Sequence, residues 1–292
     1  MDLFLVSGFL VSCCIFRPNH KLRTRNPETR NIQMNKPHPE IKDLLDEKLL
    51  LFNNKSFIAT DPIQIPHSFT KKEDIEISAF LAATIAWGQR KTIINNAQKL
   101  MLWMDNAPLD FILNHTAKEL APFKKFVHRT FNGTDCVFFI KSLQNIYLKH
   151  GGLEGAFAKG LKKNDDSVKN SITGFRKIFL ELKHEARSDK HISNPDAKSS
   201  AKRLCMYLRW MVRNDKRGVD FGIWKKINAS QLCLPLDIHT GNVSRKLGLL
   251  KREQNNWQAV EEITSVLKQF DATDPVKYDF ALFGLGAFEG FR

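Results

Sequence analysis

The chain has 292 residues, of which 42% are hydrophobic and 26% are charged, so it can bury a core and is neither a fibrous nor a disordered polymer. Lysine and arginine together number 45 against 31 acidic residues, which gives a formal net charge of +14. A protein with this charge attracts polyanions, either nucleic acid or an anionic membrane, and the charge alone does not distinguish these two partners.

The first 36 residues differ in composition from the rest of the chain. Residues 1–16 are apolar but short for a membrane span, and Asp2 stands where a signal peptide carries lysine or arginine. Residues 10–13 resemble a lipoprotein cleavage box, which keeps export as an alternative, and Met34 offers a second start of translation. We therefore predict a disordered or non-native extension over residues 1–36 and a single helical domain over residues 37–292.

The cysteines favour a reducing compartment. Their number, five, is odd, and three of them stand alone in apolar or helical segments, where a thiol acts as a small hydrophobic group. The five are Cys13, Cys14, Cys136, Cys205 and Cys233. Neither a CxxC nor an HExxH spacing occurs, so we expect no metal and no other cofactor, and a cytoplasmic protein.

Helical periodicity dominates the first half of the domain. Thr70 and Glu73 form a capping-box pattern at the start of a helix that breaks at Gly88. A second helix carries Ile93, Ala97, Leu100, Met101 and Met104 on one face and stops before Pro108. Further helices are predicted over residues 109–131 and 136–149. No segment alternates well enough to be a strand, and the fold class is predicted to be all-α.

The second half of the domain is also predicted to be helical. A turn signature at Asn194-Pro195-Asp196 precedes a helix over residues 200–213, and Val219 to Ile227 is predicted as a short extra helix. Another helix carries Val260, Ile263, Leu267 and Phe270 on one face. The pattern Thr273-Asp274-Pro275 predicts the start of the last helix.

The helix over residues 200–213 has two distinct faces. At 100° per residue, Leu204, Tyr207, Leu208 and Met211 share one face, while Lys202, Arg209 and Arg213 share the other. This predicts a basic stripe that binds an anion, with an ordinary solvated face as the alternative. Lys202 lies in the first turn, where the positive end of the helix dipole disfavours a cation, so it is the candidate nucleophile.

Asp237 is placed to cap the next helix. It follows Leu234-Pro235-Leu236 and precedes Ile238-His239-Thr240, and such a carboxylate accepts the amide hydrogens of the following turn. Taken alone, Asp237 is a helix cap and His239 a hydrogen-bonded helix residue. A carboxylate that backbone donors fix is also preorganised for catalysis, so both roles stay open.

Three segments resemble the helix-hairpin-helix DNA glycosylases. Residues 235–247 resemble the segment in which this family keeps its catalytic aspartate. Residues 80–100 are similar to its early helix pair, and residues 274–286 to the final helix of its branches directed at 8-oxoguanine, especially the archaeal one. The blocks at 209–213 and 234–240 are also similar to those of an uncharacterised bacterial family of unknown function. The resemblance covers roughly residues 70–290.

The resemblance implies a two-lobed helical bundle with a central cleft that acts as a monomer on DNA and not on membranes. Lys202 would attack the sugar C1′ to form a Schiff base, and Asp237 would assist departure of the base, with His239 as a further catalytic candidate. The implied activity is base-excision repair as a glycosylase or glycosylase/lyase, with oxidised purine as the candidate lesion. One departure from the family is clear: its glycine-rich hairpin before the lysine is here Ala197-Lys198-Ser199-Ser200-Ala201, which predicts a different hairpin geometry.

The resemblance also implies which residues contact DNA. The space of a flipped base would be filled or probed by Trp87, Gln89 and Arg90. The remaining contacts would come from Lys198, Ser199, Ser200, Arg203, Arg209, Arg213, Arg245 and Lys246. Trp210 and Trp224 are interpreted as core residues. Three alternatives remain: a catalytically silent nucleic-acid-binding protein, an exported lipoprotein, and a helical enzyme acting on a small acidic metabolite.

Overall fold

The computed structural model describes residues 39–291. Contacts within the chain separate residues 1–36 from residues 37–292, and all the helices and strands named below belong to the second unit. The predictions for the extension, including those for Cys13 and Cys14, lie outside the described residues.

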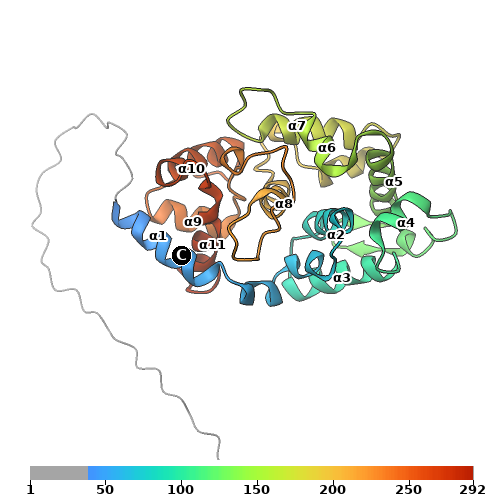
Figure 1. Ribbon diagram of the computed structural model, residues 1–292, viewed down its shortest axis with the longest axis horizontal. Coiled ribbons are helices and arrows are strands. Elements are labelled where there is room, and N and C mark those ends of the chain that lie inside the picture. Colours follow the sequence, from blue (N-terminus) through green and yellow to red (C-terminus); the bar gives the residue numbers. More distant parts are fainter. Residues whose placement is uncertain (1–38, 292) are drawn as a thin grey trace, which may run out of the picture. The chain divides into compact units, whose positions relative to one another are not determined.

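The described unit is mostly helical, as predicted, and its helices form two groups (Figure 1). Within the first group, the fully buried Phe80 contacts the rings of Phe139, Phe175 and Phe179. The helices of this group are α2 (Lys72–Thr84), α3 (Arg90–Leu102), α4 (Pro108–Asn114), α5 (Gly133–Lys149), α6 (Gly152–Ala158) and α7 (Lys169–Phe179).

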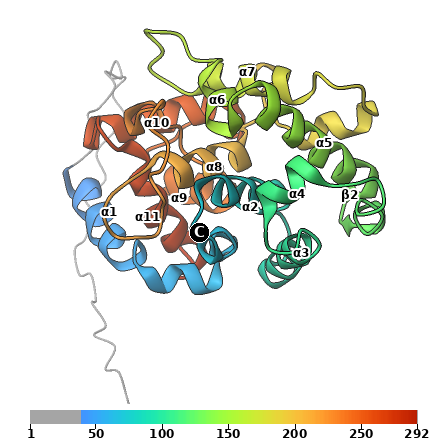
Figure 2. The same ribbon diagram turned by 45° about the vertical axis from the view of Figure 1, so that its right-hand side comes forward.

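The second group joins the start of the described chain to its end. Helix α1 (Pro39–Phe52) packs against α11 (Asp279–Ala287), which in turn packs against α9 (Ile238–Lys246), with α10 (Trp257–Phe270) beside them (Figure 2). Helix α8 (Lys202–Val212) lies between the two groups and contacts α2. It is anchored by Tyr207, Trp210 and Met211, none of which is exposed to solvent.

Short 3₁₀ helices connect the α-helices. Their ranges are Lys55–Thr60, Pro62–Gln64, Pro66–Ser68, Phe123–Lys125, Ala186–His191, Pro195–Ala197, Ala229–Gln231 and Pro275–Tyr278. Within residues 39–291, no helix combines the length and apolarity needed to cross a bilayer.

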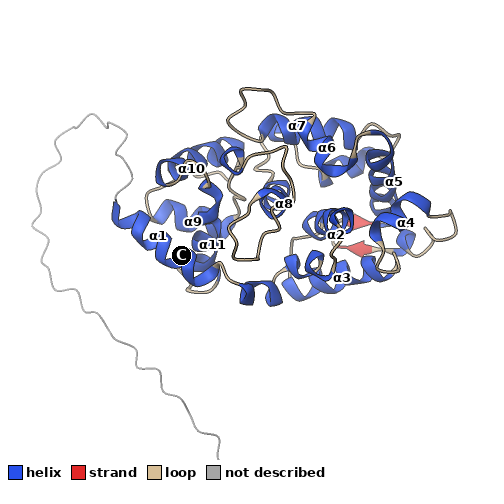
Figure 3. Cartoon of the chain, in the orientation of Figure 1, coloured by secondary structure: helices blue, strands red, loops and turns tan. Residues whose placement is uncertain are grey.

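The predicted helix over residues 109–131 is wrong beyond Asn114. Thr116 and Glu119 close a turn there, with the Thr116 amide donating to Glu119 Oε2 at 2.7 Å. The segment ends in a short antiparallel hairpin of β1 (Val127–His128) and β2 (Phe131–Asn132), shown in red in Figure 3. Each strand has only two residues, too few for alternation to be visible in the sequence.

A predicted capping box and a further predicted helix are also wrong. Helix α2 starts at Lys72 with no side-chain cap, so Thr70 and Glu73 form no capping box. Residues 219–227 are not helical, because their polar groups bond to distant partners: Trp224 Nε1 donates to Glu76 Oε1 at 2.7 Å. The buried faces predicted for α3 and α10 are confirmed, except that Phe270 is only partly buried. Trp210 and Trp224 are core residues, as expected.

Candidate active site

A pocket of about 570 Å³ lies where the two helix groups meet α8. Its walls come from the 3₁₀ helix Lys55–Thr60, the loop after α2, and α3, α8, α9 and α11. Nine of the residues predicted from sequence line it: Trp87, Arg90, Ser199, Ser200, Lys202, Arg203, Arg209, Asp237 and His239.

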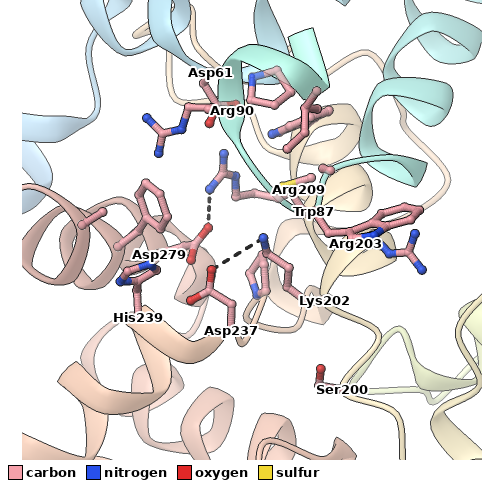
Figure 4. A pocket seen from close by; sticks show the side chains of 18 of the residues that line it. Asp61, Trp87, Arg90, Ser200, Lys202, Arg203, Arg209, Asp237, His239 and Asp279 are labelled. Atoms are coloured by element: carbon pink, nitrogen blue, oxygen red, sulfur yellow. Dashed lines mark hydrogen bonds and ion pairs between the residues drawn. The ribbon is translucent and has the colours of Figure 1, made fainter. Parts of the chain in front are cut away.

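Lys202 and Asp237 meet in this pocket. Lys202 is the first residue of α8, and its Nζ lies 3.5 Å from Asp237 Oδ2 (Figure 4). The Lys202 side chain is 30% exposed and that of Asp237 is 19% exposed, so the pair can be reached from solvent. Lys202 and Asp237, which lie 35 residues apart in the sequence, therefore face one another.

The two oxygens of Asp237 have different partners. Oδ1 accepts the Thr240 amide at 2.9 Å, and the Thr240 hydroxyl accepts the Asp237 amide at 2.8 Å, which completes a capping box at the start of α9. Oδ2 is thereby left for Lys202. The predicted cap is confirmed, and it fixes the carboxylate without using the oxygen that faces the amine.

His239 lines the pocket but is not joined to this pair. Its ring lies edge-on to Phe283, with 6.1 Å between ring centroids. In the described part of the chain no hydrogen bond connects His239 to Lys202 or Asp237. His239 therefore forms part of the wall next to the pair (Figure 4).

The hairpin before α8 adopts left-handed backbone without glycine. Lys198 has φ 64° and Ala201 has φ 48°, values that favour glycine. The Ser199 amide donates to Asn194 O at 3.2 Å, so it is not available to an anion, and Ser199 also forms an isolated antiparallel bridge with Asn256. Lys198 is exposed outside the pocket.

The predicted basic stripe on α8 is wrong for Arg209 and Arg213. They are only 4% and 2% exposed, so neither side chain is available to a phosphate on a nucleic acid. Arg209 pairs with Asp279, and with Asp220 at 3.3 Å. Arg213 pairs with Asp215, Asp220 and Asp274 at 2.8, 3.1 and 2.9 Å. Acidic side chains from the loop after α8 and from the start of α11 cover this face.

Arg203 lies beneath Trp87. Its guanidinium is 4.6 Å from the centre of the Trp87 ring and donates to the carbonyls of Thr84 and His191. No carboxylate in the described residues pairs with Arg203, and burial lowers its pKa to about 10. The Arg90 guanidinium lies over the Phe283 ring at 5.4 Å, so aromatic rings hold both arginines at the pocket wall.

Besides Lys198 and Arg213, three of the predicted DNA-contacting or base-probing residues do not line the pocket. Gln89 is exposed and precedes α3. Arg245 donates to Arg252 O at 2.7 Å and to Asn255 Oδ1 at 2.6 Å, which fixes the loop after α9. Lys246 is exposed on α9, 4.8 Å from the Phe291 ring. Their contribution to binding stays a prediction.

Two pocket carboxylates were missed from the sequence. Asp279, the first residue of α11, is 6% exposed; burial raises its pKa to about 6, although Arg209 opposes this shift. Burial also raises the pKa of Asp61, which accepts the Ile63 amide at 3.1 Å. A lone acid beside Phe280-Ala281-Leu282-Phe283 was the available signal for Asp279. Asp61 precedes Pro62 and is typical of an ordinary turn.

Comparison with known proteins gives a family but no activity. Neither a curated protein nor a solved structure matches the chain. The family model of a protein of unknown function, DUF2400, matches residues 61–288, a range that includes all the pocket residues discussed above. The chain is therefore a member of the DUF2400 family.

Proposed function

We propose that this protein excises damaged bases from DNA as a glycosylase with lyase activity, using Lys202 as the nucleophile. The observation that carries the proposal is the 3.5 Å pair of Lys202 Nζ and Asp237 Oδ2 in an accessible pocket. An amine next to a carboxylate that can take up its proton is an arrangement suited to covalent catalysis.

The proposed reaction uses both members of the pair. Lys202 gives up a proton, which Asp237 can relay to the departing base, and the Nζ lone pair then forms a bond to the sugar C1′. The C1′–N bond breaks, and its electron pair leaves with the base. The C1′–O4′ bond then opens as O4′ takes up a second Nζ proton through Asp237, which gives the Schiff base. Removal of a C2′ proton and breakage of the C3′–O3′ bond, with the 3′ phosphate as leaving group, can then cleave the strand.

The pocket offers a site for a flipped-out base beside this pair. Its volume, about 570 Å³, lies within the range of pockets that take small organic ligands. Trp87, Met206 and Phe283 supply apolar walls, and Arg209 with Asp279 supplies polar groups against which the edge of a base can form hydrogen bonds. Lys198, exposed in the hairpin before α8, is suited to a neighbouring phosphate.

Borohydride trapping tests the proposal. The reagent reduces a Schiff base to a stable amine, so the wild-type protein should form a covalent complex with duplexes carrying oxidised, alkylated or deaminated bases or an abasic site. Lys202→Ala should lose this complex completely. Lys141→Ala is the matched control, because Lys141 is an exposed lysine that does not line this pocket, and it should trap like the wild type.

Asp237→Asn separates catalysis from folding. Asparagine is also a good N-cap, so the melting temperature should stay close to that of the wild type, while base release should slow by roughly 10²- to 10⁴-fold because the proton relay is lost. If wild-type protein traps on none of these substrates, the lyase proposal fails. DNA binding that survives both substitutions would then identify a catalytically silent binding protein.

A further inference from the structure

The β1–β2 hairpin presents an arginine in a rarely adopted backbone conformation. Arg129, at its turn, has φ 55°, in the left-handed region that is energetically costly for a residue other than glycine. The Arg129 side chain is exposed, so burial does not offset this cost. Conformations of this kind persist where neighbouring contacts enforce them, and they concentrate at functional sites.

Contacts on both sides enforce the turn. His128, only 2% exposed, donates from Nε2 to Trp87 O at 3.1 Å and accepts from Asn96 Nδ2 through Nδ1 at 2.9 Å. Burial lowers the pKa of His128, in keeping with a neutral ring that donates at one nitrogen and accepts at the other. On the other side, Arg187 donates to Thr130 O at 3.1 Å and to Asp135 Oδ2 at 2.7 Å.

The hairpin is attached directly to the rim of the pocket. Trp87 and Gly88 line the pocket, and the His128 ring lies edge-on to Trp87 with 5.0 Å between ring centroids. The Arg129 guanidinium lies over Gly88: a Cβ atom added to Gly88 would be 3.0 Å from Arg129 Nη1. Gly88 therefore leaves the space that brings this arginine to the pocket mouth.

The charge at this mouth is not balanced by the protein. Within residues 39–291 no carboxylate pairs with Arg129, and Arg203 on the other side of Trp87 has only carbonyl acceptors. Arg209 and Arg213, by contrast, have several carboxylate partners each. An exposed guanidinium without an anionic partner suits a phosphate, which it can bind through two parallel hydrogen bonds.

We propose that the β1–β2 hairpin is a DNA-contacting element, in which Arg129 binds a backbone phosphate next to the nucleotide whose base enters the pocket. The inference rests on the proposed function for the nature of the partner. Anchoring by His128 and Arg187 fixes the hairpin backbone next to Trp87, so the hairpin brings the Arg129 side chain to the pocket mouth and sets which nucleotide faces Lys202. Arg129 is thus a positioning residue, and Lys202 carries out the chemistry.

Arg129→Gly tests this inference cleanly, because glycine accepts the backbone conformation while the side chain is removed. The melting temperature should be no lower than that of the wild type. Affinity for a lesion-containing duplex, measured by fluorescence anisotropy with sodium chloride varied, should fall about 3- to 10-fold at moderate salt, and the slope of log K against log salt should decrease by about 0.9, one phosphate contact. Arg129→Lys should recover part of this loss.

Lys216→Gly is the matched control. Lys216 is also exposed, basic and left-handed, with φ 62°, but it lies in the loop after α8 and not in the hairpin beside Gly88. Its replacement should leave the affinity and the salt slope almost unchanged. Equal losses for the two variants would show a general effect of net charge and overturn the inference, as would an unchanged salt slope for Arg129→Gly.

Trapping distinguishes failure of this inference from failure of the proposed function. If wild type and Arg129→Gly trap equally well at limiting protein and bind with the same salt slope, the hairpin has no role in DNA binding and the catalytic proposal stands. If wild type never traps but Arg129→Gly binds DNA more weakly than Lys216→Gly does, the catalytic proposal fails and the hairpin contact stands. Binding of neither duplex nor single strands overturns both.

Discussion

Asp237 and Asp279 are two pocket carboxylates with different surroundings. Asp237 is partly exposed and faces Lys202, whereas Asp279 is almost fully buried and pairs with Arg209. Burial raises the pKa of Asp279 to about 6, Arg209 counteracts this, and the negative charge of Asp237 adds to it. Asp279 therefore changes protonation near pH 6, and in the proposed base site it would be a donor below that pH and an acceptor above it.

The stability of the protein should reflect this titration. Because the folded-state pKa of Asp279 lies above its unfolded value of 3.8, its stabilising contribution is full below about pH 4 and is lost as pH rises through 6. Relative to Asp279→Asn, the wild-type free energy of unfolding should fall by on the order of 2 kcal/mol from pH 4 to pH 7. Urea unfolding of both proteins across this range measures the difference, and parallel curves would contradict the assignment.

For single residues, the sequence predicts a side chain's role where that role depends only on its position in its own helix. The cap formed by Asp237 follows from residues 237–240 alone, and the position of Lys202 follows from the start of α8. Arg209 and Arg213 were misjudged because helical period shows which residues share a face, not what covers that face. Their carboxylate partners lie between 2 and 70 residues away, and the helical period of α8 indicates none of them.

Among the elements, α2 is tied to its neighbours by one buried acid, Glu76. Only 2% of Glu76 is exposed, and its carboxylate accepts from Trp224 Nε1 and from Tyr147 Oη, each at 2.7 Å. Burial raises the pKa of Glu76, and Lys72 Nζ at 3.7 Å helps to keep it ionised. Through this side chain α2 is joined both to α5 and to the loop that follows α8.

Removing this acceptor should destabilise the fold. Glu76→Ala leaves the buried Trp224 and Tyr147 donors without a partner, and each such group costs about 1–3 kcal/mol, so we expect a loss of roughly 3 kcal/mol or more in the free energy of unfolding. Glu76→Gln keeps an acceptor oxygen and should lose less. Denaturant unfolding checks both variants; equal losses for alanine and glutamine would show that hydrogen bonding at Glu76 is not the cause.

Contacts with residues in other elements explain which elements the sequence misplaced. Residues 219–227 contain apolar residues at helical spacing but form a loop. Asp220 pairs with Arg213, at the end of α8, and Trp224 donates to Glu76 on α2. The β1–β2 hairpin could not be predicted from the sequence for a different reason. Its two short strands are stabilised by hydrogen bonds of His128 with Trp87 and Asn96, which lie outside the hairpin. Longer helices such as α3 and α10 are predictable because their buried faces repeat over several turns.

For the whole molecule, the dominant property is a net charge of +14. Part of the positive charge is neutralised internally, as the ion pairs of Arg209 and Arg213 show, and part is exposed at Lys198 and Arg129. Exposed charge on a basic protein speeds its association with polyanions and displaces their counterions. The sequence therefore predicts a polyanion as the partner, and the structure shows which lysine and arginine side chains are exposed.

Binding to duplex DNA should accordingly depend steeply on salt. With about four phosphate contacts, affinity should fall roughly 10²-fold between 50 and 200 mM sodium chloride. Titrations of an undamaged duplex at several salt concentrations measure this slope independently of catalysis. An affinity that does not change over this range would show that the positive surface is not used for nucleic acid.

The fold class could be predicted as a whole, and the arrangement of helices could not. Mostly helical structure follows from composition and periodicity, and it is confirmed for residues 39–291. The likeness to a helix-hairpin-helix glycosylase stays a prediction that rests on short segments. The left-handed Lys198 and Ala201 show why sequence is a weak guide there, since a hairpin can adopt glycine-like backbone without glycine.

The packing of α1 against α11 has a consequence for how the protein matures on the ribosome. The pocket wall includes Asp61, near the beginning of the described chain, and Phe283, near its end, so the wall is incomplete until residues beyond 283 have left the exit tunnel. Contacts between segments so distant in sequence form slowly, because the intervening chain must first be ordered. A partly synthesised chain thus lacks the assembled pocket, which forms only after residues beyond 283 have been translated.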